Sequence, residues 1–180
     1  KQTGLICWVI KPDGPIPYFK DEQDQRAFRA LHFAELLCEA GNQVIFISSN
    51  FIHREKRFRN HPCDKQIQTK KENLKIYLLK GFGYRKNISV SRLLHDIKLA
   101  SNFVTSVKNL SKPDVIICSF PSIFTSWRAV DFAIQHKIPF ILDIRDMWPK
   151  VLELHFRNHR ILKYLPFLWI IGLVPIAIII

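Results

Sequence analysis

Three charged side chains with catalytic potential follow directly on a short apolar run at 138–142. They are the carboxylates Asp143 and Asp146 and the guanidinium of Arg145. Ligands of open α/β sheets collect at the carboxyl ends of the strands, so we expect these groups at the rim of a crevice. We predict that Asp143 or Asp146 orients a hydroxyl or acts as a base. Arg145 keeps its proton, so its predicted role is electrostatic, on a phosphate or on developing charge.

The same rim also has a purely structural interpretation. Asp143 and Arg145 can neutralise each other as an ion pair. Asp146 can cap the next helical turn. The residues alone leave both interpretations open.

A second candidate region is the loop around Gly14, which follows the first apolar run. Backbone N–H groups in such a loop, together with the N-terminus of the next helix, can bind a phosphate. Arg26 lies one turn into the expected helix and could reach the same anion through its planar fork. A plain turn and a surface arginine are the competing interpretation.

A third candidate region combines an aromatic ring, an amide and cations between 84 and 92. We predict that Tyr84, Lys86, Asn87 and Ser89 contribute to substrate binding. Cations near a membrane surface are attracted to anionic lipid by about 1 kcal/mol each. This mixture therefore suits an anionic ligand at a membrane surface.

Positive charge is concentrated in the middle of the chain. The net charge is +12, and residues 54–92 hold twelve Lys and Arg against three acids, which is three quarters of the excess. Such a segment favours nucleic acid, anionic lipid or a diphosphate-bearing substrate. A solvated basic surface without a partner is the alternative.

Apolar runs alternate with helical periodicity along most of the chain. We expect strands at 5–10, 44–47, 74–79, 115–118 and 140–142 and helices at 24–40, 91–110 and 122–136, with a surface excursion at 50–73. The order predicts an α/β fold, a Rossmann-like doubly wound parallel sheet. Helical spacing places several large side chains inward: Leu94, Ile97, Phe103, Val104 and Val107 in one helix, and Ile123, Trp127, Val130 and Ile134 in the next.

Composition is that of one globular domain, which we place at 1–160. The chain has 180 residues, 48% of them hydrophobic and 23% charged, which excludes a disordered or fibrous protein. Four scattered cysteines lack metal-ligand spacing, so we expect reduced thiols, no metal and no cofactor. A nicotinamide site is disfavoured because no G-x-G-x-x-G follows the first run.

The last segment, 161–180, is an apolar tail with no charge after Lys163. It is short for a membrane-spanning helix and contains two prolines. A membrane anchor, a helix covered by a further domain and an effect of truncation are the alternatives, and we favour the last two.

Four segments in this order carry a family resemblance: Gly14-Pro15-Ile16-Pro17 with Gln25-Arg26, then 49–53, 83–89 and 143–149. Together they resemble the N-terminal half of family 4 glycosyltransferases of the GT-B fold, in the subgroup that builds bacterial surface polysaccharides. The resemblance covers roughly residues 3–160. Many relatives carry His at or beside the position of Arg145, so the resemblance assigns no general base to this chain.

The resemblance implies a retaining transferase that takes a sugar from a nucleotide-sugar donor. The donor would bind mainly in a C-terminal domain that this chain lacks, so we expect no transfer by the chain alone. The acceptor, a lipid-linked saccharide, would bind in this N-terminal half. The resemblance further implies a cytoplasmic enzyme, peripheral on an anionic inner membrane face, with no required metal.

Two other classes remain as alternatives. A basic nucleic-acid-binding α/β domain is supported by the charged segment alone. The sequence contains no known nucleic-acid-recognition motif, such as a helix-turn-helix, an RNA-recognition motif or a zinc finger. A non-catalytic protein anchored to a membrane by its tail is the third possibility.

Overall fold

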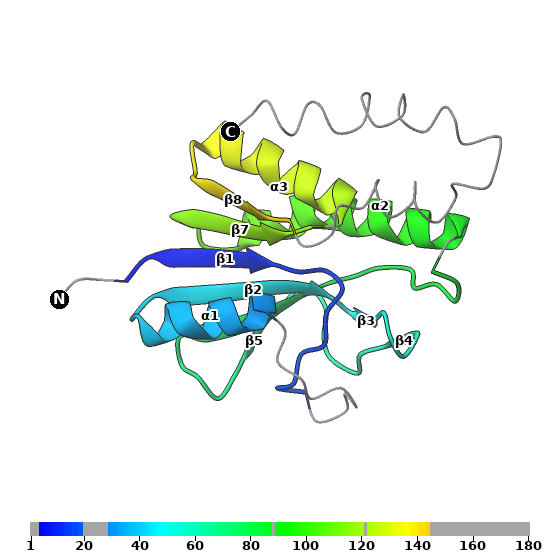
Figure 1. The fold of residues 1–180 in the computed structure, drawn as a ribbon, viewed down its shortest axis with the longest axis horizontal. Helices are drawn as coiled ribbons and strands as arrows, with labels where there is room; N and C mark the ends of the chain where they lie inside the picture. Colours follow the sequence, from blue (N-terminus) through cyan, green and yellow to red (C-terminus); the bar gives the residue numbers. More distant parts are fainter. Residues whose placement is uncertain (1–3, 20–28, 88, 121, 145–180) are drawn as a thin grey trace. The chain divides into compact units, whose positions relative to one another are not determined.

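A parallel sheet with helices on both faces forms the framework of the protein in a computed structural model. The structure describes residues 4–19, 29–87, 89–120 and 122–144. Six strands lie in the order β5-β6-β2-β1-β7-β8, and only the edge strand β5 runs antiparallel to its neighbour. Figure 1 shows α1 on one face of this sheet and α2 and α3 on the other. The prediction of an α/β fold with a mostly parallel sheet is confirmed.

The predicted strands agree closely with the observed ones. The sheet contains β1 (Ile6–Ile10), β2 (Gln43–Ser49), β5 (Gln66–Gln68), β6 (Leu74–Leu79), β7 (Val115–Ser119) and β8 (Phe140–Asp143). The helices are α1 (Arg29–Glu39), α2 (Val90–Ser106) and α3 (Ile123–His136), and the 3-10 turn η1 (Val107–Asn109) extends α2.

The expected surface excursion at 50–73 contains more structure than its composition indicated. This segment contains strand β5 and a small antiparallel hairpin of β3 (Phe51–Ile52) and β4 (Arg57–Phe58). Phe51, Ile52 and Arg59 are buried. Part of this segment is therefore buried within the domain and is not a solvated loop.

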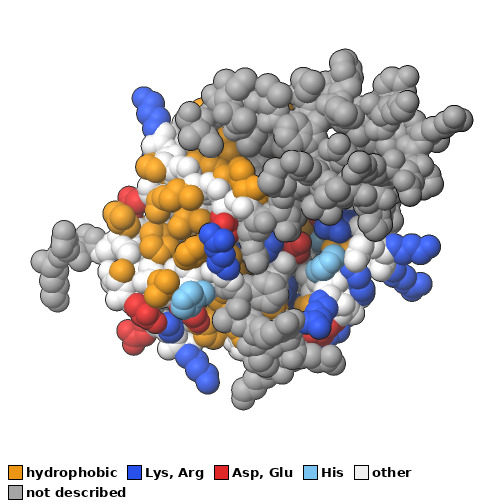
Figure 2. Space-filling model, in the orientation of Figure 1, with side chains coloured by type: hydrophobic (Ala, Val, Ile, Leu, Met, Phe, Trp, Pro, Cys, Tyr) orange, Lys and Arg blue, Asp and Glu red, His pale blue; other side chains and the backbone are white. Residues whose placement is uncertain are grey.

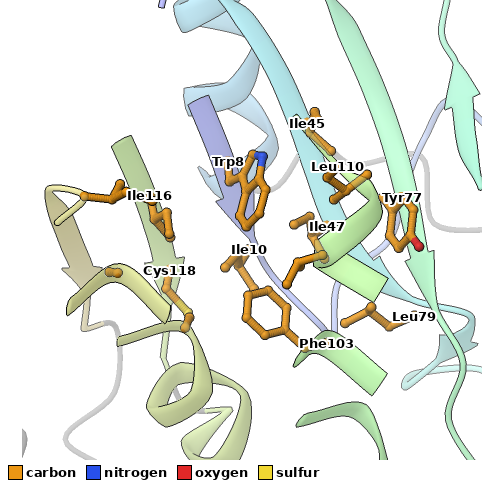
Figure 3. Close-up of a cluster of buried hydrophobic side chains, with 14 of the residues drawn as sticks. Trp8, Ile10, Ile45, Ile47, Tyr77, Leu79, Phe103, Leu110, Ile116 and Cys118 are labelled. Carbon is orange, nitrogen blue, oxygen red and sulfur yellow. The ribbon is translucent and has the colours of Figure 1, made fainter. Parts of the chain in front are cut away.

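Alternate residues of the central strands enter two separate cores, as expected when both faces of a sheet are covered. On the side of α2 and α3, Trp8, Ile47 and Leu79 meet Phe103 (Figure 3). On the side of α1, Val9, Phe46 and Leu78 belong to the cluster that includes Leu31. This burial holds the strand ends in fixed positions, and the functional groups extend from those ends.

Helix α1 packs on β1, β2 and β6 and is terminated by Gly41, whose φ of +84° is the left-handed conformation that favours glycine after a helix. Toward β7 and β8 the same face of the sheet is less covered by described residues: Ile117 is half-buried and Ile141 is exposed. Figure 2 shows hydrophobic side chains gathered at the left of the view, over the β1–β7 part of the sheet.

The predicted inward faces of the two later helices were partly wrong. In α2, Phe103 and the following Val107 are buried, but Leu94, Ile97 and Val104 are exposed. In α3 the predicted Ile123 and Val130 are half-buried, whereas Trp127 and Ile134 are exposed. The buried side of α3 consists of small residues, Thr125, Ser126, Ala129 and Ala133. Small side chains bring α3 close to its neighbours, so the large apolar residues point outward.

No helix among the described residues is long and apolar enough to cross a membrane. The tail 161–180 and the predicted domain boundary at 160 lie outside the described residues.

Candidate functional site

The strand order reverses at β1, and this creates a crevice at the carboxyl ends of the strands. β2 lies on one side of β1 and β7 on the other. Strand β1 is followed by α1 on one face of the sheet, and β7 is followed by α3 on the other face. Doubly wound proteins bind ligands at such a point.

A polar pocket opens at this point, with about 330 Å³ of space that includes open solvent. Eleven residues from five segments line it: Pro12, Asp13, Ser49, Phe51, His53, Tyr84, Arg92, His95, Asp96, Leu99 and Ser122. Two carboxylates, two imidazoles, a phenol and a guanidinium therefore converge on a small volume.

Asp13 is held at the floor of the crevice by the end of β2. The carbonyl of Pro12 accepts hydrogen bonds from the backbone N–H of Ser49 (3.0 Å) and the hydroxyl of Ser48 (3.3 Å). Lys11, which is buried, forms a 3.2 Å ion pair with the Asp13 carboxylate. The Ser122 hydroxyl, at the start of α3, lies 3.5 Å from the same carboxylate oxygen. This carboxylate therefore joins groups that follow β1 and β7.

The Arg59 side chain links the loops that surround the pocket. Its guanidinium is buried and donates to the carbonyl oxygens of Ser49, Phe51 and Gly14, the last at 2.6 Å. Arg59 thus links the Gly14 loop to the β2–β3 segment. Two of the four segments that carry the family resemblance meet at this side chain.

Tyr84 is the centre of a cluster of rings and cations. Its hydroxyl is hydrogen-bonded to Nδ1 of His53. Its ring lies 5.0 Å from that of Phe51 and 5.1 Å, edge-on, from that of His95. Lys56 Nζ stands 4.5 Å from the ring centroid and Arg92 Cζ 5.6 Å, both at cation–π distance. The prediction placed Tyr84 in a binding region, and the structure places it in the pocket wall.

His95 has a single defined tautomer. Its Nδ1 accepts the backbone N–H of Gly83 at 2.9 Å, so the ring proton of the neutral imidazole is on Nε2. Burial lowers the pKa of His95 to about 4. Burial, followed by the charge of Lys56, also lowers the pKa of His53. Both imidazoles are therefore neutral at pH 7, and Nδ1 of His95 is already engaged by the Gly83 N–H.

Burial also disfavours the charged form of Asp96, which for a carboxyl group shifts the pKa in the opposite direction. Burial raises the pKa of its carboxyl to about 6; the charge of Arg92 one helical turn earlier opposes this, and that of Asp13 adds to it. No described residue donates a hydrogen bond to Asp96. A carboxyl group that titrates near neutral pH and is open to a pocket is suited to exchange a proton with a bound hydroxyl.

The other predicted binding residues surround the pocket without lining it. Ser89 caps α2 by accepting the backbone N–H of Arg92 at 3.2 Å. Asn87 accepts Lys56 through its side chain and Arg92 through its backbone carbonyl. Lys86 is exposed. Asn87 and Ser89 thus position Lys56 and Arg92 beside Tyr84, a supporting role that the sequence did not indicate.

Asp143 lies at the carboxyl end of β8, as predicted, but on the rim outside the pocket. Its carboxylate accepts the Ser119 hydroxyl and pairs with Arg29, both at 3.2 Å. The predicted pair between Asp143 and Arg145 cannot be compared, because Arg145, Asp146 and Arg26 lie outside the described residues. For Asp143 the structure therefore adds a partner from α1 that the sequence did not indicate.

Asp13, His53, His95 and Asp96 were missed as site residues. The rule about carboxyl ends was applied to β8, but it applies equally to β1, where Asp13 stands three residues after the last strand residue. Asp96 and Arg92 are one turn apart on α2, and their spacing gave a usable signal.

Several cations of the basic segment have partners within the protein. Arg59 holds the loops, Lys71 pairs with Glu39 at 2.9 Å, and Arg57 pairs with Glu55 at 2.7 Å. The exposed positive surface is therefore smaller than the sequence count. The described residues contain no group of three or more His, Cys, Asp or Glu that could hold a metal ion, and their four cysteines are free thiols.

No protein-family model matches this chain, and no curated protein matches it.

Proposed function

We propose that this chain is the acceptor-binding half of a retaining glycosyltransferase that uses a nucleotide-sugar donor. The single observation that carries the proposal is the convergence at one pocket of segments far apart in sequence. The residues at 12–14, 49–53 and 83–87 meet around Asp13, His53 and Tyr84. Segments 49–53 and 83–89 are two of the four on which the family resemblance rests, and residues 12–13 directly precede a third, which begins at Gly14.

The chemistry of the pocket suits a hydroxyl-rich ligand with an anionic group. Carboxylates such as Asp13 and Asp96 accept hydrogen bonds from sugar hydroxyls, and aromatic rings pack on sugar faces. Lys56 and Arg92, both at cation–π distance from Tyr84, supply positive charge for a phosphate. A lipid-linked saccharide acceptor combines these features, and it would bring the protein to an anionic inner membrane face as a peripheral, cytoplasmic enzyme.

Within this proposal the pocket carboxylates Asp13 and Asp96 act on the acceptor hydroxyl, the role first predicted for Asp143 or Asp146. Asp96 is the group best placed to receive the proton of the acceptor hydroxyl, because its pKa of about 6 keeps it in exchange near neutral pH. Asp13 would orient the hydroxyl through its fixed carboxylate. Asp143 would then act at the rim rather than on the acceptor hydroxyl, and the roles predicted for Arg145 and Asp146 concern residues outside those described.

Transfer assays on a chain extended by a donor-binding domain test this proposal. A radiolabelled nucleotide sugar and a lipid-diphosphate-linked sugar would be supplied. Asp96→Asn is expected to lower kcat at least a hundredfold, within the range of general-base effects. The matched control is Asp131→Asn, an exposed carboxylate on α3. Equal rates for parent and Asp96→Asn would remove the pocket from the mechanism.

The nucleic-acid alternative is less well supported, since partners within the protein reduce the basic surface. Salt-dependent binding to a random duplex by the parent, without binding to the lipid-linked sugar, would favour it.

A further inference from the structure

The outer face of α2 is apolar although it is opposite the core. Val90, Leu93, Leu94 and Ile97 recur at the spacing of one helical face. Their exposed fractions are 72%, 47%, 51% and 43%. The core side of the same helix is formed by His95, Leu99, Ala100 and Phe103. Helix α2 therefore has a solvent-exposed apolar surface in addition to the one that packs on the core.

An exposed aromatic side chain extends this face. Phe82, in the segment between β6 and α2, is 64% exposed. Lys98 Nζ lies 5.9 Å from its ring centroid, and Asn102 donates to the carbonyl of Lys80 at 2.6 Å. These contacts fix the segment against the side of α2. We call the five residues Phe82, Val90, Leu93, Leu94 and Ile97 the apolar face.

The charges around the apolar face are of one sign. Between Lys80 and Lys98 the chain has five Lys and Arg and one acid. That acid is Asp96, which lines the pocket. Arg85 and Lys86 are exposed just before the first turn of α2, and Figure 2 shows Lys and Arg side chains projecting at the right of the view, where this segment lies. The exposed surface of this stretch therefore carries cations and no carboxylate.

This combination distinguishes α2 from α3. Helix α3 also exposes apolar residues, Phe124, Trp127 and Ile134, but its surface carries the ion pair of Arg128 with Asp131. A mixed-charge surface has no preference for an anionic partner. An apolar face surrounded only by cations is the composition of an interfacial membrane-binding element.

We propose that the apolar face of α2 inserts into the headgroup region of a bilayer that contains anionic lipid. Arg85, Lys86 and Lys98 lie at the level of the lipid phosphates. This inference deepens the proposed function, on which its account of the acceptor rests. The pocket residues Arg92, His95 and Asp96 occupy the same turns of α2 as Leu93, Leu94 and Ile97. Docking through this face therefore holds the pocket beside the membrane surface, where a lipid-linked acceptor is embedded.

Cosedimentation with vesicles tests the proposal on the full 180-residue chain. The parent is expected to bind vesicles of phosphatidylglycerol and phosphatidylcholine and to bind pure phosphatidylcholine more weakly. The triple variant Leu93→Gln, Leu94→Gln, Ile97→Gln should lose at least tenfold in partitioning. The matched control, Phe124→Gln, Trp127→Gln, Ile134→Gln on α3, should retain the parent's partitioning.

The cations are tested separately. Arg85→Gln with Lys86→Gln should weaken binding to the anionic vesicles about fivefold for each charge removed. Lys108→Gln with Lys112→Gln, two exposed cations after the apolar face, should change it much less. Circular dichroism of each variant checks that the helices remain folded.

Hydrogen exchange locates the contact without a mutation. Anionic vesicles should slow exchange in peptides covering 82–98. The proposal is overturned if protection is confined to peptides from 164–180, if the α2 variant partitions like the parent, or if the parent self-associates through α2 instead of binding vesicles. Asp13→Asn should leave partitioning unchanged, so failure of the acceptor pocket and failure of membrane docking are distinguishable.

Discussion

Two carboxylates at the same edge of the sheet, Asp143 and Asp96, differ in what surrounds them. Asp143 lies on the rim and is satisfied by the Ser119 hydroxyl and the Arg29 guanidinium. Asp96 lies in the pocket, and no described residue donates a hydrogen bond to it. Burial raises the pKa of Asp96 to about 6. The rim carboxylate has its partners within the domain, whereas the pocket carboxylate remains available to a ligand.

The same contrast applies to the loops that carry the two groups. The pocket loops are tied together by buried contacts of Arg59 with three carbonyl oxygens. The rim pair joins Arg29, whose side chain is 58% exposed, to Asp143, whose side chain is only 9% exposed. Water weakens the rim pair, and burial makes the pocket framework costly to alter.

The largest expected effect comes from Arg59→Ala. The substitution removes the Arg59 donor from the carbonyl oxygens of Ser49 and Gly14, each at a cost of about 1–3 kcal/mol, whereas the Phe51 carbonyl keeps the Ser49 hydroxyl. We expect the free energy of unfolding in urea to fall by about 3 kcal/mol or more. Arg85→Ala, at an exposed position, is the control and should change it by less than about 0.5 kcal/mol. Similar values for the two variants would show that the pocket loops do not depend on Arg59.

An intermediate effect is expected from Asp96→Asn, through pH. The folded-state pKa of Asp96 is above its unfolded value, so its contribution to stability is complete below pH 4 and is lost as pH rises through about 6. The variant has no such loss. Its unfolding free energy relative to the parent should therefore rise by about 1–2 kcal/mol between pH 4 and pH 7.5, with allowance for solvent at the pocket mouth.

Urea unfolding of parent and variant at several pH values measures this difference. His95 contributes in the opposite direction, because its folded pKa of about 4 is below the unfolded value and its contribution is lost as pH falls. It is present in both proteins, so the comparison isolates Asp96. A difference between the two proteins that stays constant with pH would contradict the proposed environment of Asp96.

The smallest effect is expected at the rim. Arg29→Ala removes a largely exposed partner of Asp143, and such pairs contribute less than about 1 kcal/mol. Thermal unfolding at low and high salt measures it, and added salt should reduce the difference further. A loss above about 2 kcal/mol would show that the rim is as strongly coupled as the pocket.

The sheet was predictable because its central strands are continuous apolar runs between turn residues, as at 74–79 and 115–118. The helix faces were less predictable. Trp127 and Ile134 have helical spacing that indicates a core, yet small residues such as Ala129 and Ala133 make the close contact. Periodicity locates an apolar stripe but does not distinguish a stripe that faces the core from one that faces a partner.

The site was predictable in part for a related reason. The sequence shows which groups follow a strand, but the strand order decides which of them meet. Tyr84 was predicted because its segment combines an aromatic ring, an amide and several cations. Asp13 was hidden in a turn between prolines, and His53 lies in an irregular excursion. Their proximity depends on β1 lying between β2 and β7, which no local pattern encodes.

The central claim is that the pocket, and not the rim, holds the acceptor. The most direct measurement is calorimetric titration of the full chain with a short isoprenyl-diphosphate-linked sugar in detergent. Asp13→Asn is expected to weaken binding at least tenfold, and Asp143→Asn to leave the dissociation constant within about twofold of the parent. The reverse order, weak binding by Asp143→Asn and parental binding by Asp13→Asn, would contradict the claim.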